Sequence, residues 1–179
     1  MDAGRGRAAR TLFVAALAAY GLDRLTKVWA EAVLPGDPIE LIPGALTLRF
    51  TENSGGAFSI GQSAPWFFVG VSAIVSLVIV VTAFRHSDRI VATGLGLVLG
   101  GALGNLTDRA IRAPDFGGHV IDFVDLHLWP VFNVADSAVV IGALLVAWRG
   151  IRDGRERPGD EPVAPSGPAP AERARPDAG

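Results

Sequence analysis

Ionisable and amide side chains form five groups within or beside the apolar stretches of this 179-residue chain. An ionisable group inside a membrane segment is costly, so each is a functional candidate by default. The five groups are Asp23 with Lys27, Asn53, Asn105 with Asp108 and Arg109, Asp122 with Asp125, and Asn133 with Asp136. In the first, third and fifth groups, members stand three or four residues apart, which puts them on one helix face.

Two facing carboxylates are the strongest candidates for chemistry among these groups. If Asp122 and Asp136 meet in a low dielectric, both cannot ionise cheaply, so the pair holds one proton. The ionised carboxylate can take a proton from water while the protonated one donates to a carbonyl, as in aspartic proteases. Asp125 fits a solvated loop carboxylate better than a catalytic one.

The sequence lacks the residues or motifs that most other kinds of catalytic site require. The chain has no cysteine, which excludes disulfides, thiolate catalysis and cysteine-based metal sites. It has three histidines and no HExxH motif, so we expect no metal and no cofactor. No GxSxG motif is present, although Ser59 or Ser137 with a loop histidine remains an alternative nucleophile. A formal net charge of −2 gives no basic field for nucleic acid.

Long apolar stretches predict an all-α polytopic membrane protein with four transmembrane helices. Residues 64–84 are 21 positions without a charge, and a helix of that length, about 31 Å, matches a bilayer core of about 30 Å. The predicted spans are about 11–34, 64–84, 90–108 and 131–149, in one domain of residues 1–152. A cleaved signal peptide at 1–22 is the alternative for the first span. Gly100, Gly101 and Gly104 would let another helix approach the third span closely.

The arginine distribution predicts which side each loop faces. Arginines gather before the first span, between the second and third, and after the fourth. The positive-inside rule then places both termini in the cytoplasm and loops 35–63 and 109–130 outside, with all five polar groups near the outer leaflet.

Three segments outside the spans carry their own predictions. Residues 46–51 alternate apolar and polar side chains, which predicts a small extracytoplasmic β element. Residues 119–129, HVIDFVDLHLW, suggest a short amphipathic helix. Residues 153–179 hold six of the twelve prolines, which predicts a disordered cytoplasmic tail rich in proline, alanine and arginine.

Five short motifs stand in order along residues 23–137. They are DRLTK at 23–27, NSGGAF at 53–58, GGALGNLTDR at 100–109, HVIDF at 119–123 and FNVADS at 132–137. Together they closely resemble the motifs of lipoprotein signal peptidases (signal peptidase II). The resemblance implies an aspartyl endopeptidase of the bacterial inner membrane with a small extracytoplasmic β cradle. Such an enzyme cuts a diacylglyceryl-modified prolipoprotein before its lipidated cysteine and releases the signal peptide.

The resemblance also implies roles for individual residues. The catalytic pair would be Asp122 and Asp136. The residues that would bind substrate or support the site are Asp23, Lys27, Asn53, Gly55, Asn105, Asp108, Arg109 and Asn133. Implied partners are prolipoproteins and membrane lipids, globomycin-type peptide antibiotics are expected to block the site, and we expect a monomer. The 13 residues of 109–121 exceed the family's usual interval, and LHLWPVFN at 126–133 is short for it.

Two other functions are compatible with buried carboxylates. A small proton-coupled transporter subunit would use Asp23, Asp108 and Asp136 as a relay, but residues 139–148 of the fourth span are wholly apolar. A non-enzymatic membrane scaffold would use the carboxylates to pair helices. It would tolerate Asp122→Asn or Asp136→Asn, because asparagine keeps the size and hydrogen bonding of aspartate, whereas a protease would not.

Overall fold

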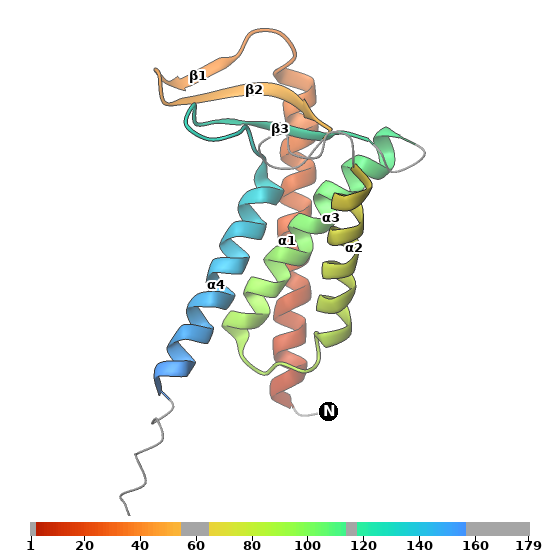
Figure 1. Ribbon diagram of the computed structural model, residues 1–179, viewed down its shortest axis with the longest axis vertical. Coiled ribbons are helices and arrows are strands. Elements are labelled where there is room, and N and C mark those ends of the chain that lie inside the picture. The colour runs from red at the N-terminus through yellow and green to blue at the C-terminus, as the bar shows by residue number, and fades with distance from the viewer. Residues whose placement is uncertain (1–2, 55–64, 114–117, 157–179) are drawn as a thin grey trace, which may run out of the picture.

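A computed structural model gives the structure of the protein and describes residues 3–54, 65–113 and 118–156. These residues form four helices side by side, with a three-stranded antiparallel sheet across one end of them (Figure 1). The helices are α1 (Ala3–Val33), α2 (Pro65–Thr82), α3 (Arg89–Arg112) and α4 (Val134–Glu156). The strands are β1 (Ile39–Ile42), β2 (Leu46–Asn53) and β3 (Val120–Asp125).

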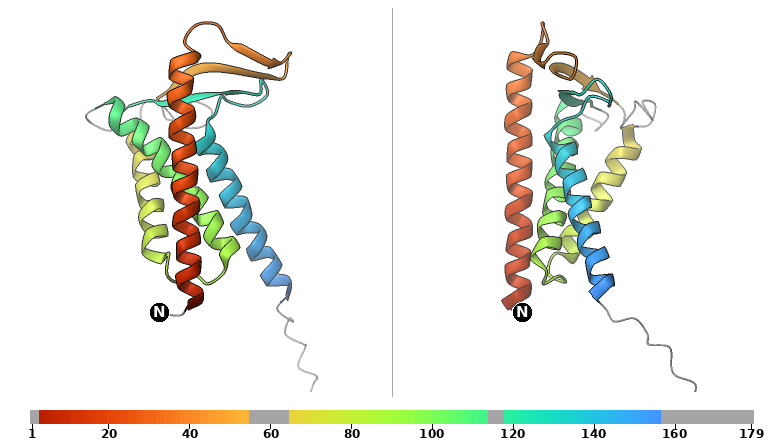
Figure 2. Two further views of the ribbon diagram at one scale, coloured as in Figure 1. Left: turned by 180° about the vertical axis from the view of Figure 1, so that it is seen from behind. Right: turned by 90° about the vertical axis from the view of Figure 1, so that its left-hand side faces the viewer.

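Helix α3 lies at the centre of the bundle and packs against all three other helices (Figure 2). Four of its glycines face backbone atoms of α1 or α4: Gly94, Gly96, Gly100 and Gly101. A Cβ at Gly100 would lie closer than 3.0 Å to the carbonyl of Ala16 in α1, and one at Gly101 equally close to that of Ala135 in α4. Small residues permit this close approach, so the prediction is confirmed for Gly100 and Gly101, whereas Gly104 lies against the carboxylate of Asp23.

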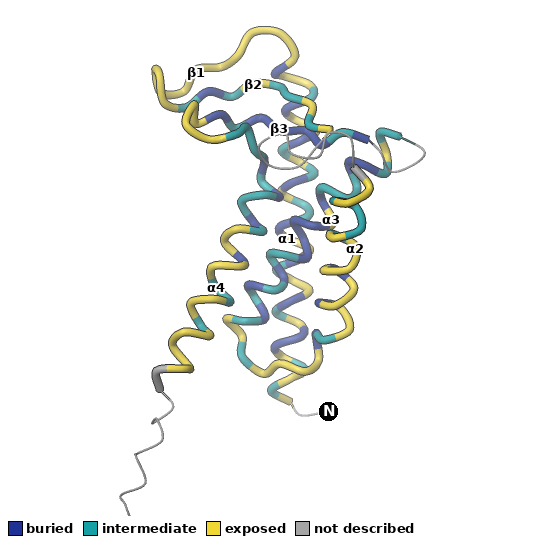
Figure 3. The backbone as a smooth tube through the Cα atoms, in the orientation of Figure 1, coloured by how far each residue is buried: buried dark blue, intermediate teal, exposed yellow. Residues whose placement is uncertain are grey.

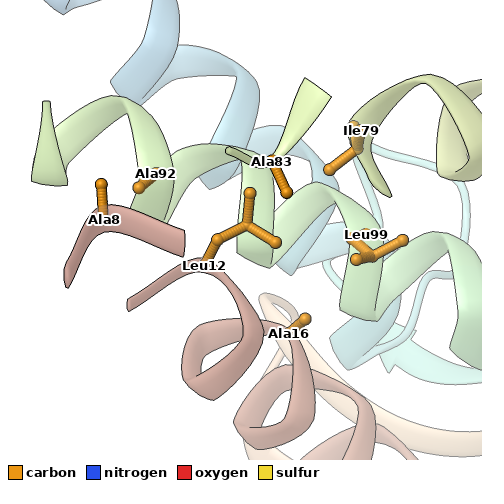
Figure 4. Close-up of a cluster of buried hydrophobic side chains, with 7 residues drawn as sticks. All are labelled: Ala8, Leu12, Ala16, Ile79, Ala83, Ala92 and Leu99. Atoms are coloured by element: carbon orange, nitrogen blue, oxygen red, sulfur yellow. The ribbon is translucent and has the colours of Figure 1, made fainter. Parts of the chain in front are cut away.

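Two apolar clusters hold the elements together. The first joins α1, α3 and the end of α2 through Ala8, Leu12, Ala16, Ile79, Ala83, Ala92 and Leu99 (Figure 4). The second fixes the sheet to the end of α1, because Ala30 and Leu34 pack against Ile121 and Phe123 of β3. The sheet is thereby held over the end of the bundle where α3 ends and α4 begins.

Much of α2 and α4 is exposed (Figure 3), and many of the exposed residues are large and apolar. Leu17, Leu25, Phe67, Ile74 and Leu144 are between 64% and 72% exposed. Soluble monomers rarely expose apolar patches of this extent. Helix α3 and residues Val134–Gly154 of α4 are long and apolar enough to cross a membrane, and Trp66–Thr82 form a shorter apolar helix.

The β element predicted over residues 46–51 is confirmed by β2, which is the middle strand of the order β1-β2-β3. The short helix suggested for 119–129 is wrong, because Val120–Asp125 form β3 and pair with β2, with Thr51 opposite Asp122. Valine, isoleucine and phenylalanine favour a strand, and β2 offers this segment an edge with which to pair. Phe132 then pairs with Val124 just before α4 begins.

Two helices continue beyond the predicted ends of their spans. Helix α3 runs to Arg112 rather than ending at Asp108, so four residues of the long 109–121 interval extend the helix. Helix α4 runs to Glu156, past the predicted start of the tail at residue 153. Ion pairs at i,i+4 spacing, Asp108 with Arg112 and Arg149 with Asp153, support both extensions. Residues 157–179 lie outside the described part, so the disordered tail stays a prediction.

Candidate active site

A cavity of about 390 Å³ lies beneath the sheet, where α3 and α4 meet β2 and β3. Asp122 of β3 and Asp136 of α4 both line it, although they come from different elements. Its other polar lining includes Asn53, Asn105 and Arg109. The fold therefore brings together candidates from four of the five groups singled out in the sequence.

The start of α4 positions Asp136. Asn133 precedes the helix, and its Oδ1 accepts a hydrogen bond from the backbone N–H of Asp136 at 2.9 Å. In return, Oδ2 of Asp136 accepts from the backbone N–H of Asn133 at 3.2 Å. This reciprocal arrangement is a helix capping box, so the NVAD sequence itself fixes the carboxylate at the helix start.

Asn133 also connects the two carboxylates. Its side-chain Nδ2 donates to Oδ1 of Asp122 at 2.7 Å. Its side-chain Oδ1 and its backbone N–H both bind Asp136, so Asn133 contacts both carboxylates. Asn133 is fully buried. Because an amide both donates and accepts, it can orient two carboxylates without adding a charge.

Two further amides contact the carboxylates. Nδ2 of Asn53 in β2 donates to Oδ2 of Asp122 at 2.9 Å, and Nδ2 of Asn105 in α3 donates to Oδ1 of Asp136 at 2.8 Å. The Oδ1 of Asn105 accepts from Lys27 Nζ at 2.8 Å, which fixes which end of this amide faces Asp136.

A buried charge network lies against the carboxylate pair and fixes the segments that carry it. Lys27 is fully buried, with its Nζ 3.0 Å from Asp23 Oδ2 and 2.8 Å from Asp108 Oδ2. Oδ1 of Asp23 accepts from the backbone of Ala135 at 3.0 Å, and Oδ2 of Asp108 accepts from that of Ile121 at 3.3 Å. Each aspartate thus holds the residue next to one member of the pair.

Two arginines of this network were missed by the sequence analysis. Asp108 is paired with Arg24 and Arg112 in addition to Lys27. Arg112 stands four residues after Asp108, a spacing that signals a pair only once α3 is known to continue past Asp108. Arg109 lines the cavity instead, and its charge interacts with those of Asp122, Asp108 and Asp136.

The surroundings of Asp122 suit proton transfer near neutral pH. Burial and, after it, the charge of Asp136 raise the pKa of Asp122 to about 7, against the lowering effect of the Asn53 and Asn133 hydrogen bonds. A carboxyl that takes up and releases its proton near pH 7 is matched to general acid–base catalysis.

The remaining candidates lie apart from this pair or outside the described residues. Asp125 does not line the cavity, and its Oδ2 accepts from Arg49 Nε at 2.6 Å. A hydrogen bond from the backbone of His127, together with Arg49, lowers the pKa of Asp125. Gly55 lies outside the described residues. Within the described ranges, no group of three or more histidine, aspartate and glutamate side chains is arranged to hold a metal ion.

Comparisons with known proteins agree on one family. A family model described as signal peptidase (SPase) II matches residues 15–152, which include the candidate site residues. Proteins named lipoprotein signal peptidase are similar to the chain. The one from Rhodococcus jostii is 47% identical over 139 residues, covering 75% of this chain and 69% of the relative. The one from Mycobacterium tuberculosis is 43% identical over 146 residues, covering 78% and 70%.

Solved structures add a likeness in three dimensions. A structure described as a bacterial membrane enzyme solved at 2.3 Å superposes with a TM-score of 0.74 at 28% identity, covering 84% of this chain and 93% of that one. A second bacterial membrane enzyme, solved at 1.9 Å, gives a TM-score of 0.66 at 26% identity, covering 80% and 94%. Sequence and fold therefore agree that this chain belongs to the signal peptidase II family.

Proposed function

We propose that this chain is a membrane aspartyl endopeptidase that removes the signal peptide from diacylglyceryl-modified prolipoproteins, with Asp122 and Asp136 as its catalytic pair. The observation that carries the assignment of the pair is their shared cavity, in which Asn133 connects one carboxylate to the other. Family membership supports the substrate class, because the relatives are named for lipoprotein processing.

The proposed reaction uses one proton shared by the two carboxylates. The ionised carboxylate takes a proton from a water molecule, whose oxygen forms a bond to the scissile carbonyl carbon. The protonated carboxyl donates its proton to the carbonyl oxygen, which gives a neutral tetrahedral intermediate. The C–N bond then breaks as the carboxyl that took the proton from water gives it to the leaving amine of the lipidated cysteine. The other carboxylate takes a proton from a hydroxyl of the intermediate, so both carboxylates return to their starting state.

The cavity wall offers a place for the lipid of the substrate. Phe68, Val71 and Val75 of α2 and Val139 and Val140 of α4 line the same cavity as the carboxylates. Acyl chains can lie against these side chains while the peptide bond reaches the polar end. This arrangement supports a cut at the membrane surface, where a lipidated cysteine would be held. Globomycin-type peptide antibiotics are expected to occupy the same cavity and block it.

The proposed setting is the bacterial cytoplasmic membrane, crossed by all four helices, with both termini in the cytoplasm and the carboxylates at the outer leaflet. The exposed apolar faces of the helices support the embedding, and the arginines at the sheet-free end support the orientation. The same faces supply contacts for membrane lipids. The cavity is built from one copy of the chain, which is consistent with a monomer.

The decisive experiment is cleavage of a diacylglyceryl-modified prolipoprotein by the purified protein in detergent, followed by gel mobility. Asp122→Asn and Asp136→Asn are each expected to lower the rate by at least about a thousandfold while the protein stays folded. Asp125→Asn is the matched control and should retain activity, because Asp125 pairs with Arg49 outside the cavity. The prolipoprotein without its lipid should remain uncut.

Two results would contradict the proposal. Cleavage that survives in either cavity variant removes that residue from the mechanism. A folded wild-type protein that cuts neither form of the substrate returns attention to a proton relay or a scaffold.

A further inference from the structure

A second cavity lies at the opposite end of the bundle from the carboxylates, where α3 begins and α4 ends (Figure 1). Its volume is about 430 Å³, and its lining consists of Asp88, Arg89, Ile90, Trp148, Arg149 and Arg152. Trp148 stands 12 positions after Asp136 on α4, a rise of about 18 Å along the helix. The proposed peptidase reaction therefore makes no use of this cavity.

The lining of this cavity is positively charged and partly fixed in place. Nε of Arg149 donates to Asp88 Oδ2 at 2.6 Å, and its Nη1 donates to Asp153, so two carboxylates hold this guanidinium. The guanidinium of Arg152 lies over the ring of Trp148, 5.8 Å from its centroid. The lining contains three arginines and one aspartate, which gives it a formal charge of +2, or +1 when Asp153 is included.

Exposed apolar side chains border the charged lining. Ile90 and Trp148 of the lining are 38% and 49% exposed. Leu144 and Ile151 stand four positions before and three after Trp148, on the same face of α4, and are 64% and 61% exposed. A cavity of this volume is far larger than a single water molecule needs. A soluble anion would contact only the arginines, whereas a molecule with an anionic head and acyl chains would contact both kinds of surface.

We propose that this cavity binds the phosphate-bearing headgroup of an anionic phospholipid in the cytoplasmic leaflet. Guanidinium groups bind phosphate through paired N–H donors, and indole rings favour the level of the headgroups. The acyl chains of the lipid lie along Leu144, on the bilayer side of Trp148. The assignment rests on the proposed membrane orientation and is independent of the carboxylate chemistry.

The test uses the full chain in phosphatidylcholine vesicles that contain increasing fractions of brominated phosphatidylglycerol. Replacing Trp29, Trp66 and Trp129 by phenylalanine leaves Trp148 as the one tryptophan of the chain, and bromine quenches its fluorescence when the lipid binds. Arg89→Gln with Arg152→Gln should raise the half-saturating lipid fraction more than tenfold, at about fivefold for each arginine. Arg7→Gln with Arg10→Gln is the matched control. It also removes two arginines at this end of the bundle, but neither of them lines the cavity.

The outcomes separate a site from general attraction to the bilayer. A shift confined to the cavity variant supports the proposal, and equal shifts in both variants overturn it. Displacement of the lipid by millimolar inorganic phosphate or glycerol phosphate assigns the cavity to a soluble anion and also overturns it. Prolipoprotein cleavage by the wild-type chain in the same vesicles is a separate readout, so failure of the lipid site and failure of the peptidase assignment are distinguishable.

Discussion

At the scale of single residues, the carboxylate pair is oriented by neutral donors. The four carboxylate oxygens of Asp122 and Asp136 accept hydrogen bonds from Asn133 Nδ2, Asn53 Nδ2, Asn105 Nδ2 and the Asn133 backbone N–H. None of these donors carries a charge, so the four hydrogen bonds fix the geometry of the pair without adding a charge to it. The charges of Lys27, Asp23 and Asp108 act one contact further away, through Asn105 and the backbone.

Asn53→Ala is expected to change the pH dependence of cleavage. The pKa of Asp122 is raised to about 7, so in the proposed mechanism kcat/KM falls as the pH rises through about 7 and the shared proton is lost. The hydrogen bond from Asn53 favours the carboxylate and lowers this pKa. Its removal should therefore raise the pKa and move the alkaline limb of the pH–rate profile to higher pH.

The control for this profile is Arg49→Gln on the same strand. Arg49 pairs with Asp125 and is not part of the cavity lining, so its loss should leave the alkaline limb in place. An unchanged or lowered limb in Asn53→Ala would show that Asp122 does not set the pH dependence.

Much of the site is predictable from sequence, because carboxylates and amides inside apolar stretches are conspicuous and their i,i+3 and i,i+4 spacing gives a shared face. Asp122, Asp136, Asn105 and Asn133 were all singled out on that basis or by motif. Residue spacing does not predict contacts between different elements. For example, Asp23 accepts a hydrogen bond from the backbone of Ala135, which is 112 residues away in the chain. Arg24 was missed for the same reason, since its pairing with Asp108 joins α1 to α3.

At the scale of elements, the path of α3 between α1 and α4 depends on backbone contacts that leave no room for a side chain. A Cβ at Gly96 would lie closer than 3.0 Å to the carbonyl oxygen of Leu12 and to Cβ of Ala15. Both obstacles belong to the body of α1 rather than to a flexible side-chain end, so the helices themselves would have to separate.

Gly96→Ala is therefore expected to destabilise the protein by about 1–3 kcal/mol. Gly21→Ala in α1 is the matched control, because nothing lies within 4 Å of the added Cβ. An alanine in an open helical position stabilises by about 0.5–1 kcal/mol relative to glycine. Thermal unfolding in detergent should give a lower midpoint for the first variant and an equal or higher midpoint for the second, and equal shifts would contradict the close packing.

Strand β3 could not be predicted from the local sequence alone. Residues 119–129 contain enough alternating and clustered apolar side chains to fit a short amphipathic helix or a strand. The strand forms because β2 lies alongside, with Asn53 opposite Val120 and Thr51 opposite Asp122. That pairing joins segments about 70 positions apart, so no local pattern specifies it, whereas the local alternation at 46–51 was sufficient to predict β2.

At the scale of the whole molecule, the two ends of the bundle carry charge differently. At the sheet end, basic side chains are matched by acids: Arg49 with Asp125, Arg112 with Glu31, and Lys27 with Asp23 and Asp108. At the other end, the first residues of α1 and the loop between α2 and α3 add Arg5, Arg7, Arg10 and Arg85 to the arginines of the second cavity. This asymmetry favours retention of the arginine-rich end in the cytoplasm.

Single cysteines test that orientation directly, because the chain has no cysteine of its own. Asp37→Cys places a thiol between α1 and β1, and Ser87→Cys places one between α2 and α3; both positions are exposed and line neither cavity. With a membrane-impermeant maleimide on intact bacteria, Asp37→Cys should react at once and Ser87→Cys only after the membrane is permeabilised. The wild-type chain should remain unlabelled under both conditions, and both variants should still cleave prolipoprotein. A reversed pattern would put the carboxylates on the cytoplasmic side, where they could not meet an exported prolipoprotein. Reaction of both thiols in intact cells would show that α2 does not cross the membrane.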